Sequence, residues 1–251
     1  MVPYDTDLVH LGNCLELMRG LPDGFCDHIV ADPPYDERTH KGQRSQGADA
    51  SNIDFAPLQP GDIGILAAEF LRLAKRWVLV FCPMRSFGEW EDAAGDGWVR
   101  DGLWIKPDSA PQFTGDRPAQ GGEGIAIMHR PGRKRWNGGG KHGVWTCGVE
   151  RVERVHPCQK PIGLMLDLMA DFTDPGDLVL DPYAGSGSTG VACIELGRGF
   201  LGFELRVDYA EIANARLAAT ERKQEIWRAS GKRAPTTVQT QMGLGLRDGN
   251  E

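Results

Sequence analysis

Residues 181–190 read Asp-Pro-Tyr-Ala-Gly-Ser-Gly-Ser-Thr-Gly, and they decide which fold the chain can adopt. Residues 178–180 (Leu-Val-Leu) are typical of a short buried strand, and residues 191–196 (Val-Ala-Cys-Ile-Glu-Leu) are typical of a helix. A strand, a glycine turn and a helix start form a cradle for a nucleoside. Gly185 and Gly187 carry no Cβ to obstruct a ligand, and the helix N-terminus offers free N–H groups.

Acidic residues follow two expected strands near this turn. Asp181 lies at the end of the first strand, and residues 199–204 (Gly-Phe-Leu-Gly-Phe-Glu) form a second strand that ends in Glu204. A carboxylate in that position can accept hydrogen bonds from both hydroxyls of a ribose. The glycine spacing differs from the G-x-G-x-x-G of dinucleotide enzymes, and an ordinary tight turn is the alternative interpretation. With the acid in register, the pattern favours a nucleoside cofactor site.

The chain has 251 residues, of which 41% are hydrophobic. This size suits one α/β domain, which we expect to span residues 1–229. Residues 230–251 are polar without an apolar period, which predicts a disordered tail. No apolar run is long enough to cross a membrane, and residues 1–7 lack the features of a signal peptide. We therefore expect a cytoplasmic protein without membrane contact.

The distribution of charge limits the classes of binding partner that the chain can have. The net charge of −7 argues against a protein that coats nucleic acid nonspecifically. Residues 129–141 are a local exception, because they hold five basic residues and no acid, together with Trp136, Asn137 and glycines. Such a run is usually a solvated loop, but this mixture also suits contact with phosphates and bases. The six cysteines form no Cys-x-x-Cys pair, which indicates neither a zinc site nor a disulfide framework.

Hydrophobic periodicity predicts alternating strands and helices. The expected strands lie at residues 8–13, 26–31, 77–81, 98–105, 123–129, 178–180 and 199–204. The expected helices lie at residues 14–21, 63–76, 87–94, 162–172, 191–196 and 208–229. Residues 36–60 and 130–154 are expected to be irregular.

The tetrapeptide Asp32-Pro-Pro-Tyr35 directly follows the expected strand at residues 26–31. Two prolines cannot continue a ladder, so the motif lies at the sheet edge where ligands bind in open α/β sheets. The lone pair of an exocyclic amine on a base is delocalised into the ring. A site must therefore accept hydrogen bonds from the amino hydrogens. The Asp32 carboxylate and the Pro33 carbonyl are suitable acceptors, Pro34 adds rigidity, and Tyr35 would stack on a base that has been flipped out of the duplex.

These motifs together resemble the amino-directed DNA methyltransferases, which transfer the methyl group of S-adenosylmethionine to N6 of adenine or N4 of cytosine. The blocks that match in order are residues 12–16, 32–35, 104–106, 115–118 with Glu123, 156–161, 181–190 and 202–204. They extend over residues 8–217. Because the tetrapeptide precedes the cofactor loop, the order is similar to that of the β class of this family.

The resemblance implies the Rossmann-like fold of class I S-adenosylmethionine-dependent methyltransferases, in circularly permuted β-class order. That fold is a doubly wound, seven-stranded, mostly parallel sheet whose last strand is typically antiparallel. A target-recognition region would be inserted at about residues 106–155. Double-stranded DNA is the implied partner, and a homodimer is expected because many members are dimers. A cognate restriction endonuclease would be a separate protein, and a solitary bacterial or phage enzyme fits equally well.

The resemblance also implies site residues, position by position. The catalytic set is Asp32, Pro33, Pro34 and Tyr35. The cofactor-binding set is Asn13, Cys14, Asp32, Gln159, Lys160, Pro161, Asp181, Ala184, Gly185, Ser186, Gly187, Thr189 and Glu204. The DNA-binding candidates are Arg38, Lys41, Arg44, Arg117, Arg133, Lys134, Arg135, Asn137 and Lys141. The family's first block often has Asp where this chain has Asn13, which keeps an acceptor but loses the charge. Direct transfer requires no metal.

Several alternatives stay open at this point. In the family, Asp-Pro-Pro-Tyr is more usual for N6-adenine and Ser-Pro-Pro for N4-cytosine, so adenine is favoured and cytosine is the alternative. Pro157-Cys158-Gln159 matches the nucleophile tripeptide of cytosine C5 methyltransferases, but here it lies inside His156-Pro-Cys-Gln-Lys-Pro161. More distant alternatives are a catalytically degenerate DNA-binding protein and a methyltransferase for RNA or protein. A nicotinamide dehydrogenase is disfavoured by the glycine spacing.

Overall fold

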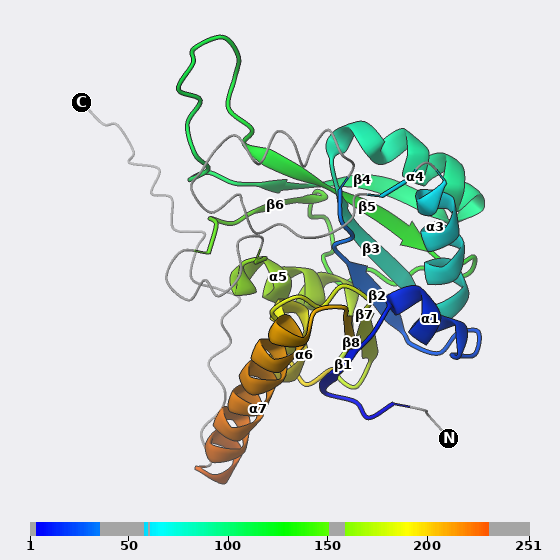
Figure 1. Cartoon of the computed structure of the whole chain (residues 1–251), viewed down its shortest axis with the longest axis vertical. Helices are drawn as coiled ribbons and strands as arrows, with labels where there is room; N and C mark the ends of the chain where they lie inside the picture. Colours follow the sequence, from blue (N-terminus) through cyan, green and yellow to red (C-terminus); the bar gives the residue numbers. More distant parts are fainter. Residues whose placement is uncertain (1–3, 36–57, 60, 151–158, 231–251) are drawn as a thin grey trace.

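The computed structural model describes residues 4–35, 58–59, 61–150 and 159–230, and an eight-stranded sheet runs through the middle of them (Figure 1). The spatial order of the strands is β1-β8-β7-β2-β3-β5-β4-β6. The strands are β1 Leu8–Leu11, β2 His28–Ala31, β3 Trp77–Cys82, β4 Trp98–Ile105, β5 Gly122–His129, β6 Val144–Thr146, β7 Leu178–Asp181 and β8 Gly199–Glu204. Five neighbours, from β1 to β3, run parallel, and β5 runs antiparallel to both β3 and β4.

The mostly parallel α/β sheet is confirmed, but it has eight strands where seven were expected. The additional strand is β6, which pairs parallel to β4 inside a segment expected to be irregular. Only Trp145 of its three residues is buried. A single buried residue leaves no period for the sequence to display, so the pairing is decided by the tertiary structure.

Helices cover both faces of the sheet, as a doubly wound fold requires (Figure 1). They are α1 Cys14–Arg19, α3 Asp62–Leu73, α4 Phe87–Ala94, α5 Ile162–Phe172, α6 Ser188–Glu195 and α7 Val207–Ala229. The helices α1, α3 and α4 share one core with Val78, Val80 and Cys82 of β3, whereas α5, α6 and α7 share the other core with Trp77, Leu79 and Phe81. The alternation of side chains along a strand therefore explains why the sequence of β3 is apolar throughout.

The strand directions give the sheet two distinct edges. We call the edge at which β1, β2, β3, β7 and β8 end the carboxyl edge, and the edge at which they begin the amino edge. The chain leaves β4 and enters β5 at the carboxyl edge, and it leaves β5 at the amino edge, because Cys82 pairs with Gly124 and Trp77 with His129. None of the described helices has the length and apolar character needed to span a bilayer.

Candidate functional site

Three acids gather at the carboxyl edge because the strands that carry them are neighbours. Asp32 directly follows β2, Asp181 ends β7 and Glu204 ends β8, in the spatial order β8-β7-β2. Burial raises the pKa of Asp181 to about 7, and the charges of Asp32 and Glu204 act in the same direction. Acids that are far apart in the sequence therefore lie within electrostatic reach of one another.

The glycine turn is fastened to two of these acids. The Asp181 carboxylate accepts hydrogen bonds from the Tyr183 N–H at 2.9 Å and from the Thr189 hydroxyl at 2.5 Å. The Glu204 carboxylate accepts from the Gly185 N–H at 2.9 Å and from the Arg206 N–H at 2.8 Å. Each carboxylate oxygen carries a further lone pair. The turn is thus held in shape by the same carboxyl groups that the sequence predicts as cofactor contacts.

The two glycines of the turn have different reasons to be glycine. Both have a left-handed φ, of 50° at Gly185 and 80° at Gly187. A Cβ on Gly187 would lie 3.1 Å from the Cβ of Ala213 in α7, so this position allows α7 to approach the turn. A Cβ on Gly185 would meet no atom closer than 4.0 Å. The sequence predicted that both glycines leave space for a ligand. In the structure Gly185 leaves open space beside the turn, whereas Gly187 makes room for α7.

Two other predicted cofactor residues, Ala184 and Ser186, build the same turn. The backbone N–H of Ala184 donates to the Phe203 carbonyl at 2.9 Å, which fixes the turn against β8. The Ser186 hydroxyl accepts from the Arg216 guanidinium at 3.0 Å. Ser188, the first residue of α6, was not predicted, and its buried hydroxyl has no hydrogen-bond partner among the described residues.

Asn13 and Cys14 lie at the start of α1, just after β1. The Asn13 side chain accepts from the Leu15 N–H at 3.0 Å and so caps the helix. Burial raises the pKa of the Cys14 thiol, which also makes a hydrogen bond with the Tyr183 side chain. The predicted first block is therefore in contact with the glycine turn through Tyr183.

The tetrapeptide lies at the centre of a partly buried charge network. The Lys160 ammonium donates to Asp32 Oδ2 at 2.7 Å and to Glu123 Oε1 at 2.8 Å. Lys106 donates to Glu123 Oε2 at 2.5 Å. The Tyr35 hydroxyl donates to Glu123 and lies 3.4 Å from Asp32 Oδ1. Two acids, two lysines and one phenol thus form a continuous set of contacts, which we call the carboxyl-edge network.

The charges in this network shift each other's proton affinity. Burial raises the pKa of Asp32, and the neighbouring charge of Glu123 adds to that effect. Burial would also raise the pKa of Glu123, but Lys160 and Lys106 outweigh that effect and lower the pKa to about 2. The two carboxylates raise the pKa of Lys160 although its burial acts the other way. Glu123 and Lys160 therefore stay charged, while burial and Glu123 hold the pKa of Asp32 above its ordinary value.

Glu123 and Lys106 belong to blocks that carry the family resemblance, yet neither residue was predicted to have a role. Lys106 follows β4 and Glu123 lies near the start of β5. Consecutive antiparallel strands bring those two positions to one edge. The expected pairing of the two strands could therefore have indicated from the sequence that Lys106 and Glu123 lie close together. Pro161 is the N-cap of α5, and it thereby places Lys160 at the same edge. His156 and Cys158 lie outside the described residues.

The predicted DNA contacts separate into three groups. Arg38, Lys41 and Arg44 lie outside the described residues. Arg117 belongs to the connection between β4 and β5 at the carboxyl edge, where it is exposed and pairs with Asp116 at 2.8 Å. The third group, Arg133, Lys134, Arg135, Asn137 and Lys141, follows the end of β5 at the amino edge. The structure therefore does not bring this third group to Asp32.

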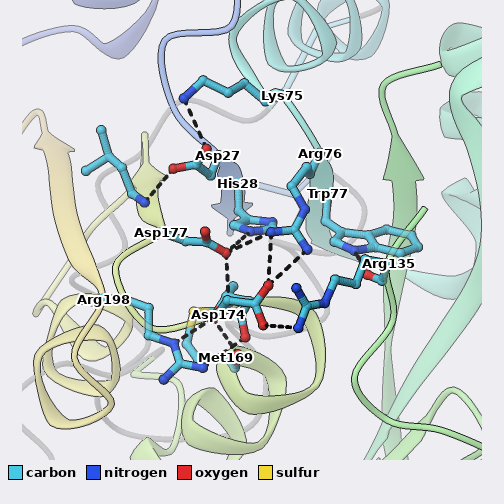
Figure 2. Close-up of polar contacts among 12 residues, drawn as sticks. Asp27, His28, Lys75, Arg76, Trp77, Arg135, Met169, Asp174, Asp177 and Arg198 are labelled. Carbon is cyan, nitrogen blue, oxygen red and sulfur yellow. Dashed lines mark hydrogen bonds and ion pairs between the residues drawn. The ribbon is translucent and has the colours of Figure 1, made fainter. Parts of the chain in front are cut away.

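Contacts at the amino edge show what part of this basic segment does. Asn137 donates to the Thr173 carbonyl at 2.9 Å, and Lys141 pairs with Asp171 at 2.7 Å. Figure 2 shows Arg135 beside Asp174, to which it pairs at 3.2 Å. These side chains fasten the segment to the end of α5 and the turn after it. The position follows from β5 running antiparallel, which the charge pattern did not reveal.

Comparisons with known proteins agree with this arrangement. Residues 129–215 match a family model described as DNA methylase. The Type II methyltransferase M.HinfI of Haemophilus influenzae is 26% identical over 239 residues, which cover 82% of this chain and 67% of that protein. The Type II methyltransferase M2.MboI of Moraxella bovis is 25% identical, over 83% of this chain and 86% of that protein.

Solved structures share the fold. The structure described as the M1.HpyAVI-SAM complex matches with a TM-score of 0.65 and 24% identity, over 84% of this chain and 98% of that one. The PvuII DNA methyltransferase, described as cytosine-N4-specific, matches with a TM-score of 0.66 and 14% identity, over 90% of this chain and 95% of that one. The ordered motifs, the sheet and these relatives agree: part of the chain matches the family model described as DNA methylase, and over most of its length the chain is similar to Type II methyltransferases.

Proposed function

We propose that this protein transfers the methyl group of S-adenosylmethionine to N6 of an adenine that is flipped out of double-stranded DNA, within one short recognition sequence. The observation that carries the proposal is the adjacency of two sites at the carboxyl edge. Asp32-Pro-Pro-Tyr35 follows β2, and the glycine turn follows its neighbour β7. An acceptor for an amine thus lies beside a cradle for a nucleoside cofactor.

The residues of the turn fit S-adenosylmethionine. Gly185 leaves space where a side chain would stand, and the buried Ser188 hydroxyl at the start of α6 suits a carboxylate, as a helix N-terminus does. Glu204 would hold the ribose, and Asn13 and Cys14 would line the adenine. The methionine end would contact the remaining predicted residues, Gln159, Lys160, Pro161, Asp181, Ala184, Gly185, Ser186, Gly187 and Thr189. When bound, this cofactor supplies an activated methyl group on a sulfonium.

The residues of the chain would act on the amine. Asp32 and the Pro33 carbonyl accept hydrogen bonds from the amino hydrogens, so that the nitrogen lone pair points away from the ring plane. Positive charge develops on that nitrogen as it reacts, and the Asp32 carboxylate stabilises it most strongly where water is excluded. The Tyr35 ring stacks on the base and fixes its plane. Pro34 limits the backbone freedom of this segment.

N4-cytosine is the alternative target, because the family includes both reactions. The tetrapeptide Asp-Pro-Pro-Tyr supports adenine through the resemblance described above. Asp32, Pro33 and Tyr35 would act in the same way on either amine, so the carboxyl-edge network is compatible with both bases.

DNA is proposed to approach the carboxyl edge. Arg117 lies in the connection between β4 and β5 on that side, and Arg38, Lys41 and Arg44 follow Tyr35 closely in the sequence. For the amino-edge residues Arg133 to Lys141, DNA contact remains a prediction that their position does not support. A homodimer and a separate cognate restriction endonuclease also remain proposals.

The experiment that tests this function is methylome sequencing of a methylation-free bacterial host that expresses the chain. One recurrent short motif carrying N6-methyladenine is expected. N4-methylcytosine in a motif would keep the chemistry and overturn the choice of base. If cells expressing folded protein carry neither mark, the proposed function is wrong. A host expressing Asp32→Ala at the same level is the control, and its DNA should carry neither mark.

A further inference from the structure

The carboxyl-edge network contains one acid, Glu123, to which neither the motif nor the proposed chemistry gives a role. It is buried, with 8% of its surface exposed, and it touches three other members of the network. Lys160 and Lys106 pair with its two carboxylate oxygens at 2.8 Å and 2.5 Å, and the Tyr35 hydroxyl donates to it. Glu123 is therefore the residue through which the network is joined.

Lys160 creates a difficulty for Asp32. Its ammonium donates to Asp32 Oδ2 at 2.7 Å, although Asp32 is also the acceptor needed by the target amine. A lysine bound only to Asp32 would compete with the amine for the carboxylate and would oppose the positive charge that develops there. Glu123 accepts from the same ammonium at 2.8 Å, so Lys160 is shared between two acids. Among the described residues, the hydrogen-bond partner of Asp32 Oδ1 is the Tyr35 hydroxyl, at 3.4 Å.

Glu123 also affects the orientation of Tyr35. A tyrosine that stacks on a flipped base must hold its ring in one orientation, and a ring has rotational freedom unless its hydroxyl is fixed. Glu123, on β5, accepts the hydroxyl hydrogen of Tyr35, which follows β2. The charge of Glu123 is itself compensated by Lys106, whose ammonium also lies 4.1 Å from the centre of the Trp104 ring. Glu123 is thus tied through Lys106 to the end of β4 while it contacts Lys160 and Tyr35.

We infer that Glu123 is a positioning residue for methyl transfer: it draws the Lys160 ammonium away from sole pairing with Asp32 and fixes the Tyr35 ring against the target base. This inference rests on the proposed function. It assigns Glu123 no contact with the reacting atoms. Lys106 is the counter-charge that keeps Glu123 ionised in its buried position.

The test compares Glu123→Gln with the wild-type protein on a duplex carrying the recognition sequence. The amide keeps the size of the side chain and loses its charge. We expect kcat to fall by about 100-fold, as misplacement of reacting groups does, with little change in the KM for S-adenosylmethionine. The acidic limb of the kcat profile should move to lower pH, because the charge of Glu123 contributes to the raised pKa of Asp32. A merely structural role would lower activity without moving that limb.

Two further variants keep the inference falsifiable if Glu123→Gln folds poorly. Tyr35→Phe removes the hydroxyl held by Glu123 and keeps the ring, and it should lengthen the fluorescence lifetime of 2-aminopurine at the target position, because a loosely held ring quenches the base less. Glu69→Gln is the matched control, because Glu69 pairs with Arg72 on α3 at 2.6 Å and touches no member of the network. It should keep wild-type kcat and fluorescence lifetime.

The outcomes separate the two proposals. If the wild-type protein methylates no DNA, the proposed function fails, and the positioning role fails with it. If the wild-type protein is active and Glu123→Gln matches it in kcat and pH profile, only the positioning role is overturned. An unchanged 2-aminopurine lifetime in Tyr35→Phe would overturn the role of Glu123 in fixing the ring.

Discussion

Both edges of the same sheet carry a charge network, and the two networks differ in kind. At the carboxyl edge, Asp32 and Glu123 share Lys160, and all three side chains are largely buried. At the amino edge, Asp177 accepts from His28 at 2.8 Å, from Arg76 at 3.0 Å and from the Asp174 backbone at 2.7 Å (Figure 2). We call the latter set the amino-edge network.

The difference lies in the groups used and in what they fasten. The amino-edge network uses arginine, whose planar fork is preorganised to hold acids and carbonyls. There Arg198 donates to the Thr173 carbonyl at 2.9 Å, and Arg76 joins β3 to the turn before β7. The carboxyl-edge network uses lysines on flexible stems and has an acid with a raised pKa. Density of charge therefore does not mark the site, whereas position at the carboxyl ends of the parallel strands does.

The largest expected difference between the two networks comes from removing Asp32. Asp32→Ala should lower kcat by about 1,000-fold or more, because it removes an acceptor for the amine and a stabilising charge. The free energy of unfolding and the affinity for S-adenosylmethionine should change little. Steady-state kinetics with equilibrium binding check both. Near-normal turnover in this variant would show that Asp32 has been given the wrong role.

The corresponding change at the amino edge should affect stability instead. Asp177→Ala leaves Arg76 and His28 without their shared acceptor, and the free energy of unfolding should fall by about 3 kcal/mol. At a temperature where the variant is folded, kcat should match the wild type. Denaturant unfolding and kinetics on the same preparation provide the measurement. A loss of kcat without a loss of stability would mean that the edges are not functionally distinct.

A smaller effect is expected from pH at the amino edge. Burial lowers the pKa of His28 below its usual 6.5, although Asp177 acts the other way. Protonation therefore favours the unfolded chain, and the contribution of His28 is complete above the unfolded pKa and lost as the pH falls through the folded pKa. The free energy of unfolding should thus fall more steeply with decreasing pH in wild type than in His28→Gln. Equal slopes in this pH range would contradict this.

The smallest expected effect is on DNA affinity, which should differ between substitutions at the two edges. Arg117→Met at the carboxyl edge should weaken affinity a few-fold and reduce the salt slope by about 1, as expected for a lost phosphate contact. Arg133→Met at the amino edge removes the same charge and should leave both quantities unchanged. Titrations at several salt concentrations test the pair. If Arg133→Met weakened binding as much as Arg117→Met, DNA would have to reach the amino edge as well.

The local elements were largely predictable. The bounds of α4 and α5 agree with the periodicity of the sequence, and the seven expected strands are all present. Of the strands in the described part of the chain, only β6 was missed, because Trp145 alone of its residues is buried. Ordered motifs also revealed the resemblance to amino-directed DNA methyltransferases, since each one pairs a turn or strand end with a side chain of definite chemistry. Roles that depend on contacts between distant segments were harder to predict. Glu123 and Gly187 are examples, because their roles depend on Lys160 and Ala213 respectively.

The sequence by itself determined the alternation of strands and helices, the glycine turn, the amine-accepting tetrapeptide and the acid at the end of β8. These depend on local backbone preferences and on burial at fixed periods, which neighbouring residues encode. Only the tertiary structure decided that Lys160 lies between Asp32 and Glu123, and that the basic segment after β5 lies at the edge opposite Asp32. Both follow from strand order and direction. Strand order and direction are set by pairing between distant strands, and no local pattern of charge indicates which strands pair.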